Sequence, residues 1–228
     1  MDLPFTTEQF LNVFREYNIA IWPAQVVAYF LGAGAIGLAV RGSSWATRII
    51  SLLLAAFWVW MGAVYHLTFF WDINPAAVLF GSLFVVQGLL FLVASVRATL
   101  QFSIRSDLYG WVGGLFVAYA IAIYPAIGAM LGHGYPQAPM FGVSPCPTTI
   151  FTFGLLLWTR GRVPAWLLII PTLWALIGFT AALTLGILED TGLLVTGLLG
   201  TGLLLYRNRS GREDARKTAF ANDPQNEN

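Results

Sequence analysis

The residue types that could carry out chemistry gather in one stretch, residues 132–154, which reads GHGYPQAPMFGVSPCPTTIFTFG. It holds His133, one of 2 histidines in the chain, and Cys146, the single cysteine. A thiol can act as a nucleophile with an imidazole as its base. The same groups could also ligate a metal ion, provided that the second histidine, His66, joins them. Cys146, His66 and His133 are therefore candidate catalytic residues and candidate metal ligands.

The composition places these residues in a membrane protein. Of 228 residues, 57% are hydrophobic and only 10% are charged, with a mean hydropathy of +0.71. A soluble domain has about 25% charged residues, so most of this surface must face lipid. The single cysteine excludes an internal disulfide and a multi-cysteine metal centre. A retinal Schiff base is excluded as well, because it needs a lysine within a span and the only lysine is Lys217.

Apolar runs predict an all-α polytopic bundle of seven transmembrane helices, judged against the ~20 residues that a spanning helix needs. Residues 1–18 precede them with aromatic residues at helical spacing, which favours an amphipathic helix in the membrane interface. Residues 207–228 are polar and carry both signs of charge, which is typical of a disordered tail. The seven runs within residues 19–206 are Ile19–Val40, Trp45–Phe70, Pro75–Val96, Asp107–Leu131, Thr148–Thr159, Val163–Leu185 and Asp190–Tyr206.

The distribution of basic residues predicts the orientation of this bundle. Cytoplasmic connections of membrane proteins are enriched in lysine and arginine. With seven spans, all but Arg15 of the 12 basic residues fall on one side of the membrane. The N-terminus is therefore expected outside and the tail in the cytoplasm. The basic residues on the cytoplasmic side are Arg41, Arg48, Arg97, Arg105, Arg160, Arg162, Arg207, Arg209, Arg212, Arg216 and Lys217.

The fifth run is too short to cross the bilayer. Residues 148–159 would form about 18 Å of helix at 1.5 Å per residue, against a hydrocarbon layer of about 30 Å. Its N-terminus should therefore begin below the outer surface, at Pro147 or Thr148. Irregular backbone at that depth must face protein or a water-filled cavity. This pattern predicts one wall of a pocket on the outer side, although a plug that only fills the bundle is an alternative.

Further polar residues are expected at the level of this pocket. Gln25 and His66 lie at similar depths in the first and second spans, and Asp72 and Asn74 occupy the short second connection. Glu189 and Asp190 are expected in a solvated turn ahead of the last helix. The candidate ligand-binding residues are Cys146, Thr148, Thr149, His66, Gln25, His133, Tyr135, Asp72 and Asn74.

Four segments also carry a family resemblance. They read LPFTTEQFLNVFREYN, WPAQ, YHLTFFWDINPAA and PCPTTIFTFG. With them, the chain resembles a bacterial family of integral membrane proteins of unknown function, over residues 1 to about 206. The resemblance implies a multi-span protein of the bacterial inner membrane. It implies no activity, substrate or catalytic residue.

The leading hypothesis is a periplasm-facing pocket that binds a small ligand or a metal ion for sensing or uptake. One alternative is a membrane-embedded enzyme with Cys146 as nucleophile and His66 or His133 as base. Another is a structural or assembly protein without a ligand. The lipid bilayer is an expected partner and nucleic acid is not. The sequence specifies neither a cofactor nor an oligomeric state.

Overall fold

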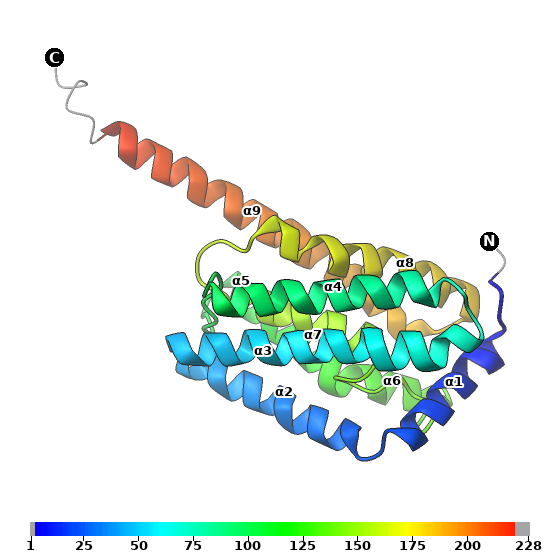
Figure 1. Cartoon of the computed structure of the whole chain (residues 1–228). Helices are drawn as coiled ribbons and strands as arrows, with labels where there is room; N and C mark the ends of the chain where they lie inside the picture. Colours follow the sequence, from blue (N-terminus) through cyan, green and yellow to red (C-terminus); the bar gives the residue numbers. More distant parts are fainter. Residues whose placement is uncertain (1–2, 222–228) are drawn as a thin grey trace.

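The computed structural model describes residues 3–221 of the chain, with side chains as far as Arg212. The described part is a bundle of α-helices (Figure 1). Its β-type pairing is limited, among these residues, to an isolated bridge between Phe102 and Thr159. The predicted all-α class is confirmed.

Six helical segments of this bundle are long and apolar enough to cross a membrane. A seventh, α7 (Pro145–Leu157), is apolar but shorter. Their positions match the seven predicted runs, while seven crossings and the predicted orientation stay predictions. The six are α2 (Ala24–Arg41), α3 (Ser44–Trp60) continued by η1 (Met61–Phe69) and η2 (Phe70–Asp72), α4 (Ala77–Val96), α5 (Leu108–Ala118) continued by η3 (Tyr119–Ile123) and α6 (Tyr124–Met130), η4 (Ala165–Leu167) with α8 (Ile169–Leu185), and η5 (Leu188–Asp190) with the first part of α9 (Thr191–Ala221).

The short helix α7 lies in the middle of the bundle, with other helices in front of it and behind it (Figure 1). All of its residues are buried, as expected of a helix that is apolar on every side. Its backbone approaches α5 closely at Gly154 and Gly113. A Cβ atom at Gly154 would lie only 2.9 Å from the Gly113 carbonyl oxygen, so a side chain at this crossing would force the two helices apart.

The first helix, α1 (Thr7–Ala20), lies obliquely across one end of the bundle (Figure 1). Thr6 caps it, and the Gln9 side chain bonds back to the Thr6 backbone. The Tyr17 hydroxyl donates to the carbonyl oxygen of Val143 at 2.7 Å. Burial raises the pKa of Tyr17, which keeps this hydroxyl protonated. The predicted helix is confirmed, and its place in the membrane interface stays a prediction.

The end of the chain differs from the expected disordered tail. Helix α9 continues to Ala221, so residues 207–221 are helical and only residues 222–228 lie outside the described part. Arg207 bonds to the carbonyl oxygen of Thr159 at 2.9 Å, and Asn208 bonds to that of Val163 at 2.7 Å. These contacts hold the first turn beyond the apolar run in helical form, and they depend on residues nearly fifty positions away.

Candidate functional site

A cavity of about 220 Å³ lies at the end of the bundle where α1 meets the N-terminus of α7. Most of its wall is aromatic or aliphatic, and Cys146 and Asp190 stand among its few polar members. We call it the Cys146–Asp190 cavity. Its lining consists of Leu3, Phe5, Phe10, Phe14, Tyr65, Phe70, Asn74, Phe80, Pro145, Cys146, Trp174, Ile177, Gly178, Thr180, Ala181, Ala182, Leu185, Ile187 and Asp190.

The N-terminus of α7 opens beside this cavity. The helix begins at Pro145, slightly earlier than the predicted start at Pro147 or Thr148, and Ser144 precedes it as the cap residue. The first three helical N–H groups normally lack a helical partner. Because Pro145 and Pro147 have no N–H, only that of Cys146 is left in these three positions. The sequence therefore removes most of the donors that made a buried helix N-terminus look costly.

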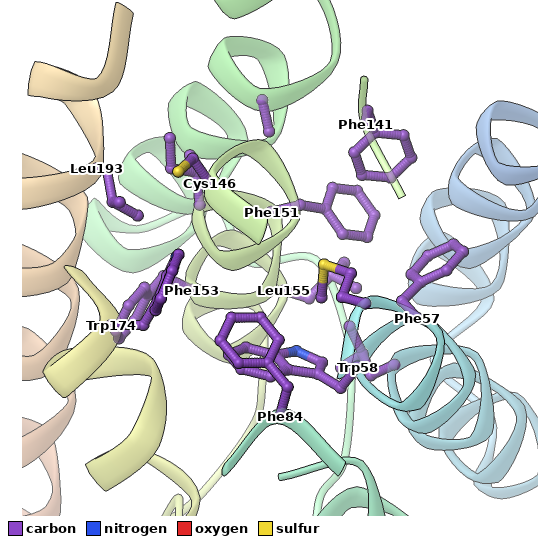
Figure 2. Close-up of a cluster of buried hydrophobic side chains, with 14 of the residues drawn as sticks. Phe57, Trp58, Phe84, Phe141, Cys146, Phe151, Phe153, Leu155, Trp174 and Leu193 are labelled. Carbon is purple, nitrogen blue, oxygen red and sulfur yellow. The ribbon is translucent and has the colours of Figure 1, made fainter. Parts of the chain in front are cut away.

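The Cys146 side chain lies beside the carboxyl group of Asp190 and the indole of Trp174. Figure 2 shows Cys146, Leu193 and Trp174 on one side of α7, with Phe57 and Phe141 on the other. Asp190 accepts a hydrogen bond from the Tyr124 hydroxyl at 2.6 Å. One oxygen of this carboxyl group is thus held by the protein, while the residue itself lines the cavity.

The expected solvated turn at Glu189 and Asp190 is wrong. Glu189 is 0% exposed and Asp190 is 4% exposed. The turn η5 is held inward because the Tyr119 hydroxyl donates to the Glu189 carbonyl oxygen at 2.8 Å, in addition to the bond from Tyr124. Two acidic residues are therefore buried at the start of the last apolar segment.

His133 faces the buried Glu189. Its Nδ1 atom lies 3.5 Å from Glu189 Oε1, and the Glu189 side chain is only 1% exposed. Neither Glu189 oxygen has a hydrogen-bond partner within the described residues. A buried carboxyl group without a compensating partner is costly, and within the described residues His133 is the one basic side chain within 4 Å of Glu189. Sequence reasoning placed His133 at the pocket but did not find this pair.

His66 is fully buried in the π-helical segment η1, and neither of its ring nitrogens has a partner among the described residues. Its ring centroid lies 4.8 Å from that of Phe84 and 5.2 Å from that of Trp174. His66 is thus packed among aromatic rings next to the cavity and does not line it. In the described part of the chain, no hydrogen bond joins Cys146 to either imidazole.

Three of the predicted ligand-binding residues lie near the cavity but do not line it. Thr148 and Gln25 form hydrogen bonds that connect neighbouring segments, and Thr149 is buried. The Thr148 hydroxyl accepts a hydrogen bond from the Gly142 N–H at 2.9 Å, which ties the loop before α7 to the helix. The Thr149 hydroxyl is buried and has no partner within the described residues. Gln25 donates to the carbonyl oxygen of Asn18 at 2.7 Å and so links α2 to α1.

Of the remaining predicted residues, one lines the cavity and two lie on the surface. Asn74 lines the cavity and accepts a hydrogen bond from the Ala76 N–H at 3.1 Å. Asp72 is exposed, and Tyr135 is 53% exposed on the surface. Of the nine candidate ligand-binding residues, the structure therefore places only Cys146 and Asn74 in the wall of the cavity.

The metal hypothesis gains no support from this arrangement. Within the described residues, no group of three or more His, Cys, Asp or Glu side chains is placed to hold a metal ion.

The residues that sequence reasoning missed are Asp190, Tyr124 and Trp174. A signal for Asp190 was available, because two adjacent acids at the start of an apolar run are unusual in a membrane protein.

Comparison with known sequences assigns most of the chain to a family. The sequence model of a family described as "Family of unknown function (DUF6064)" matches residues 7–215. No curated protein and no solved structure matches the chain.

Proposed function

The chain belongs to the DUF6064 family of unknown function, and we propose that it is a bacterial inner-membrane protein that binds a small ligand in the Cys146–Asp190 cavity. The six long apolar helices fit a membrane protein. Binding would serve sensing or uptake. Sensing is the better-supported role, since the side chains that the structure describes form no chain of ionisable groups from the cavity through the other half of the bundle.

The proposed orientation places the cavity on the periplasmic side. The predicted cytoplasmic side carries nearly all of the basic residues. Two of these basic residues lie at the same end of the bundle: Arg105 and Arg207 are 5.4 and 5.2 Å from the centre of the Tyr109 ring. Arg207 bonds at the C-terminal end of α7, whereas the cavity lies at its N-terminal end. With the basic end in the cytoplasm, the cavity faces outward.

The observation that carries the proposal is a largely apolar cavity with a buried acid in its wall. A cavity of about 150 Å³ accommodates benzene, so 220 Å³ suffices for a slightly larger organic molecule. Aromatic walls with a few convergent polar groups are typical of small-molecule sites. Asp190 accepts hydrogen bonds, so the fitting ligand has an apolar body and one donor group, either neutral or cationic.

The enzyme alternative lacks its main requirement. A cysteine nucleophile needs an activating base within hydrogen-bond reach, and Cys146 has the Asp190 carboxyl group beside it instead of an imidazole. A neighbouring acid does not favour the thiolate. Ligand binding therefore accounts for the site better than cysteine catalysis does.

The test is a thermal-shift screen of small amines and alcohols against the purified protein in detergent. Ala182 lines the cavity, whereas Leu183, its neighbour on α8, is 62% exposed. Ala182→Phe should fill the cavity and abolish the shifts, and Leu183→Phe should preserve them. Asp190→Asn should weaken the binding of amines more than that of alcohols. Compounds that stabilise the Ala182→Phe variant as well as the natural protein would contradict the proposed site.

A further inference from the structure

A groove of about 460 Å³ lies at the opposite end of the bundle from the Cys146–Asp190 cavity. One wall is the connection between α7 and α8, and the other is α9. We call it the Arg162–Arg212 groove. Its lining consists of Arg162, Val163, Pro164, Ala165, Trp166, Leu205, Asn208, Arg209 and Arg212.

The two walls of this groove are fastened to each other. The Asn208 side chain accepts a hydrogen bond from the Val163 N–H at 3.1 Å and donates one to the Val163 carbonyl oxygen at 2.7 Å. Val163 itself is 0% exposed. These two hydrogen bonds between the Asn208 side chain and the Val163 backbone fix the connecting loop on α9. The groove is therefore a built feature of the fold, with Arg162 on one wall and Arg209 on the other.

The charged rim of the groove is basic. Arg209 and Arg212 are three positions apart on α9, which places them on the same helical face, and both are exposed. Arg162 adds a third exposed guanidinium from the other wall. Among residues whose side chains the structure describes, no acidic residue lines the groove. Arginine suits phosphate because its planar donors can bind two oxygens at once.

Apart from Asn208, the other lining residues are apolar, with Leu205 on α9 and the rest on the α7–α8 connection. Leu205 is 39% exposed, and Tyr206 beside it is 67% exposed. Trp166 is half-buried in the opposite wall, and tryptophan is enriched where membrane helices meet the headgroup layer. A free phosphate ion would use the arginines and leave this apolar part unfilled. A phospholipid uses both, with its phosphate on the rim and its chains along the apolar wall.

From this combination we infer that the Arg162–Arg212 groove binds the headgroup of an anionic phospholipid. Basic pockets between transmembrane helices bind such headgroups in other membrane proteins. The groove then anchors α9 and the α7–α8 connection to the lipid leaflet at the basic end of the bundle. This inference does not depend on the ligand of the Cys146–Asp190 cavity.

The experiment is a titration of the detergent-purified full chain with phosphatidylglycerol, followed by native mass spectrometry and thermal unfolding. Phosphatidylcholine and inorganic phosphate form the other arms. A triple variant carries Arg162→Gln, Arg209→Gln and Arg212→Gln. A matched triple variant removes the same charge with Arg41→Gln, Arg48→Gln and Arg97→Gln, which are exposed and do not line the groove.

Phosphatidylglycerol should bind the natural protein and the matched variant equally well. Each groove arginine contributes about fivefold in affinity, at roughly 1 kcal/mol per basic residue near a headgroup, so the triple groove variant should bind about a hundredfold more weakly. The single variant Arg209→Gln, with an expected loss of about fivefold, gives the same answer if the triple variant does not fold. An equal loss in the matched variant would show general charge attraction and overturn the assignment. Phosphatidylcholine or inorganic phosphate binding as tightly as phosphatidylglycerol would overturn it too.

Discussion

The two ends of α7 are built from opposite kinds of contact. At the C-terminal end, Arg207 donates to the carbonyl oxygens of Leu157 and Thr159 and to the Thr159 hydroxyl. Trp158 adds a bond from its indole to the Gly110 carbonyl oxygen at 2.9 Å. At the N-terminal end, two prolines remove donors, and the Cys146 side chain borders a cavity.

This difference separates the structural end of the helix from the end where a ligand fits. Buried polar groups in proteins are nearly always hydrogen-bonded, and unpaired ones are costly. Around the N-terminal half, the Thr149 hydroxyl, both His66 nitrogens and the Glu189 carboxyl oxygens lack hydrogen bonds in the described part of the chain, whereas at the C-terminal end Arg207 lacks one only at Nε. Evolution for stability alone would pair or remove such groups. Two of them adjoin the cavity wall, because His66 packs against Trp174 and Glu189 precedes Asp190, which supports a binding function for this end.

The largest effect is expected from Arg207→Ala at the structural end. The variant leaves the carbonyl oxygens of Leu157 and Thr159 without their charged donor inside the bundle, which should lower the free energy of unfolding by about 3 kcal/mol. Arg160→Ala is the control, since Arg160 is exposed and its loss should change stability by less than about 0.5 kcal/mol. Thermal unfolding in detergent measures both. Equal stability of the two variants would show that this end is not held by Arg207.

The next effect is expected from His133→Ala at the cavity end. Removing the imidazole leaves the Glu189 carboxyl group buried without its neighbour, and the expected loss of stability is about 2 kcal/mol. Glu189→Gln should be tolerated better, and the double variant His133→Ala with Glu189→Gln should be more stable than His133→Ala alone. Additive losses in this double-mutant cycle would mean that the two residues do not interact.

The smallest effects are expected at Thr148 and Thr149. These neighbours in the first turns of α7 allow a bonded hydroxyl to be compared with an unbonded one. Thr148→Val removes the acceptor of the Gly142 N–H and should cost about 1–2 kcal/mol. Thr149→Val replaces a buried hydroxyl that has no partner, so stability should be unchanged or should rise. Chemical unfolding of the two variants measures the difference. A larger loss for Thr149→Val would reveal a bond at Thr149 and weaken the contrast between the two ends.

The positions of the helices could be predicted from the sequence because they depend on local features. The run Trp45–Phe70, for example, corresponds to helix over Ser44–Asp72, since apolar length and flanking polar residues mark both ends. The cap at Thr6 was likewise predictable, because a capping threonine and its partner Gln9 are three positions apart.

The parts that could not be predicted depend on contacts between distant residues. Asp190 is buried through Tyr124, which is 66 positions away, and its sequence neighbourhood resembles an ordinary turn. The helical start of the expected tail depends on Arg207 reaching Thr159. His66 and Cys146 were both expected in the pocket, yet the packing of aromatic rings around His66 keeps its imidazole out of the wall.

The most direct test of the contrast between the two ends is the reactivity of Cys146, which is the only cysteine in the chain. Methylmercury chloride is a small uncharged reagent that binds sulfur by displacing the thiol proton and so does not depend on a preformed thiolate, and intact-mass spectrometry counts its additions to the folded protein. If the cavity admits small organic molecules, Cys146 should be modified in the natural protein and in Leu183→Phe but protected in Ala182→Phe. Modification only after denaturation would show that the N-terminal end of α7 is sealed like its C-terminal end, and would contradict the ligand-binding account.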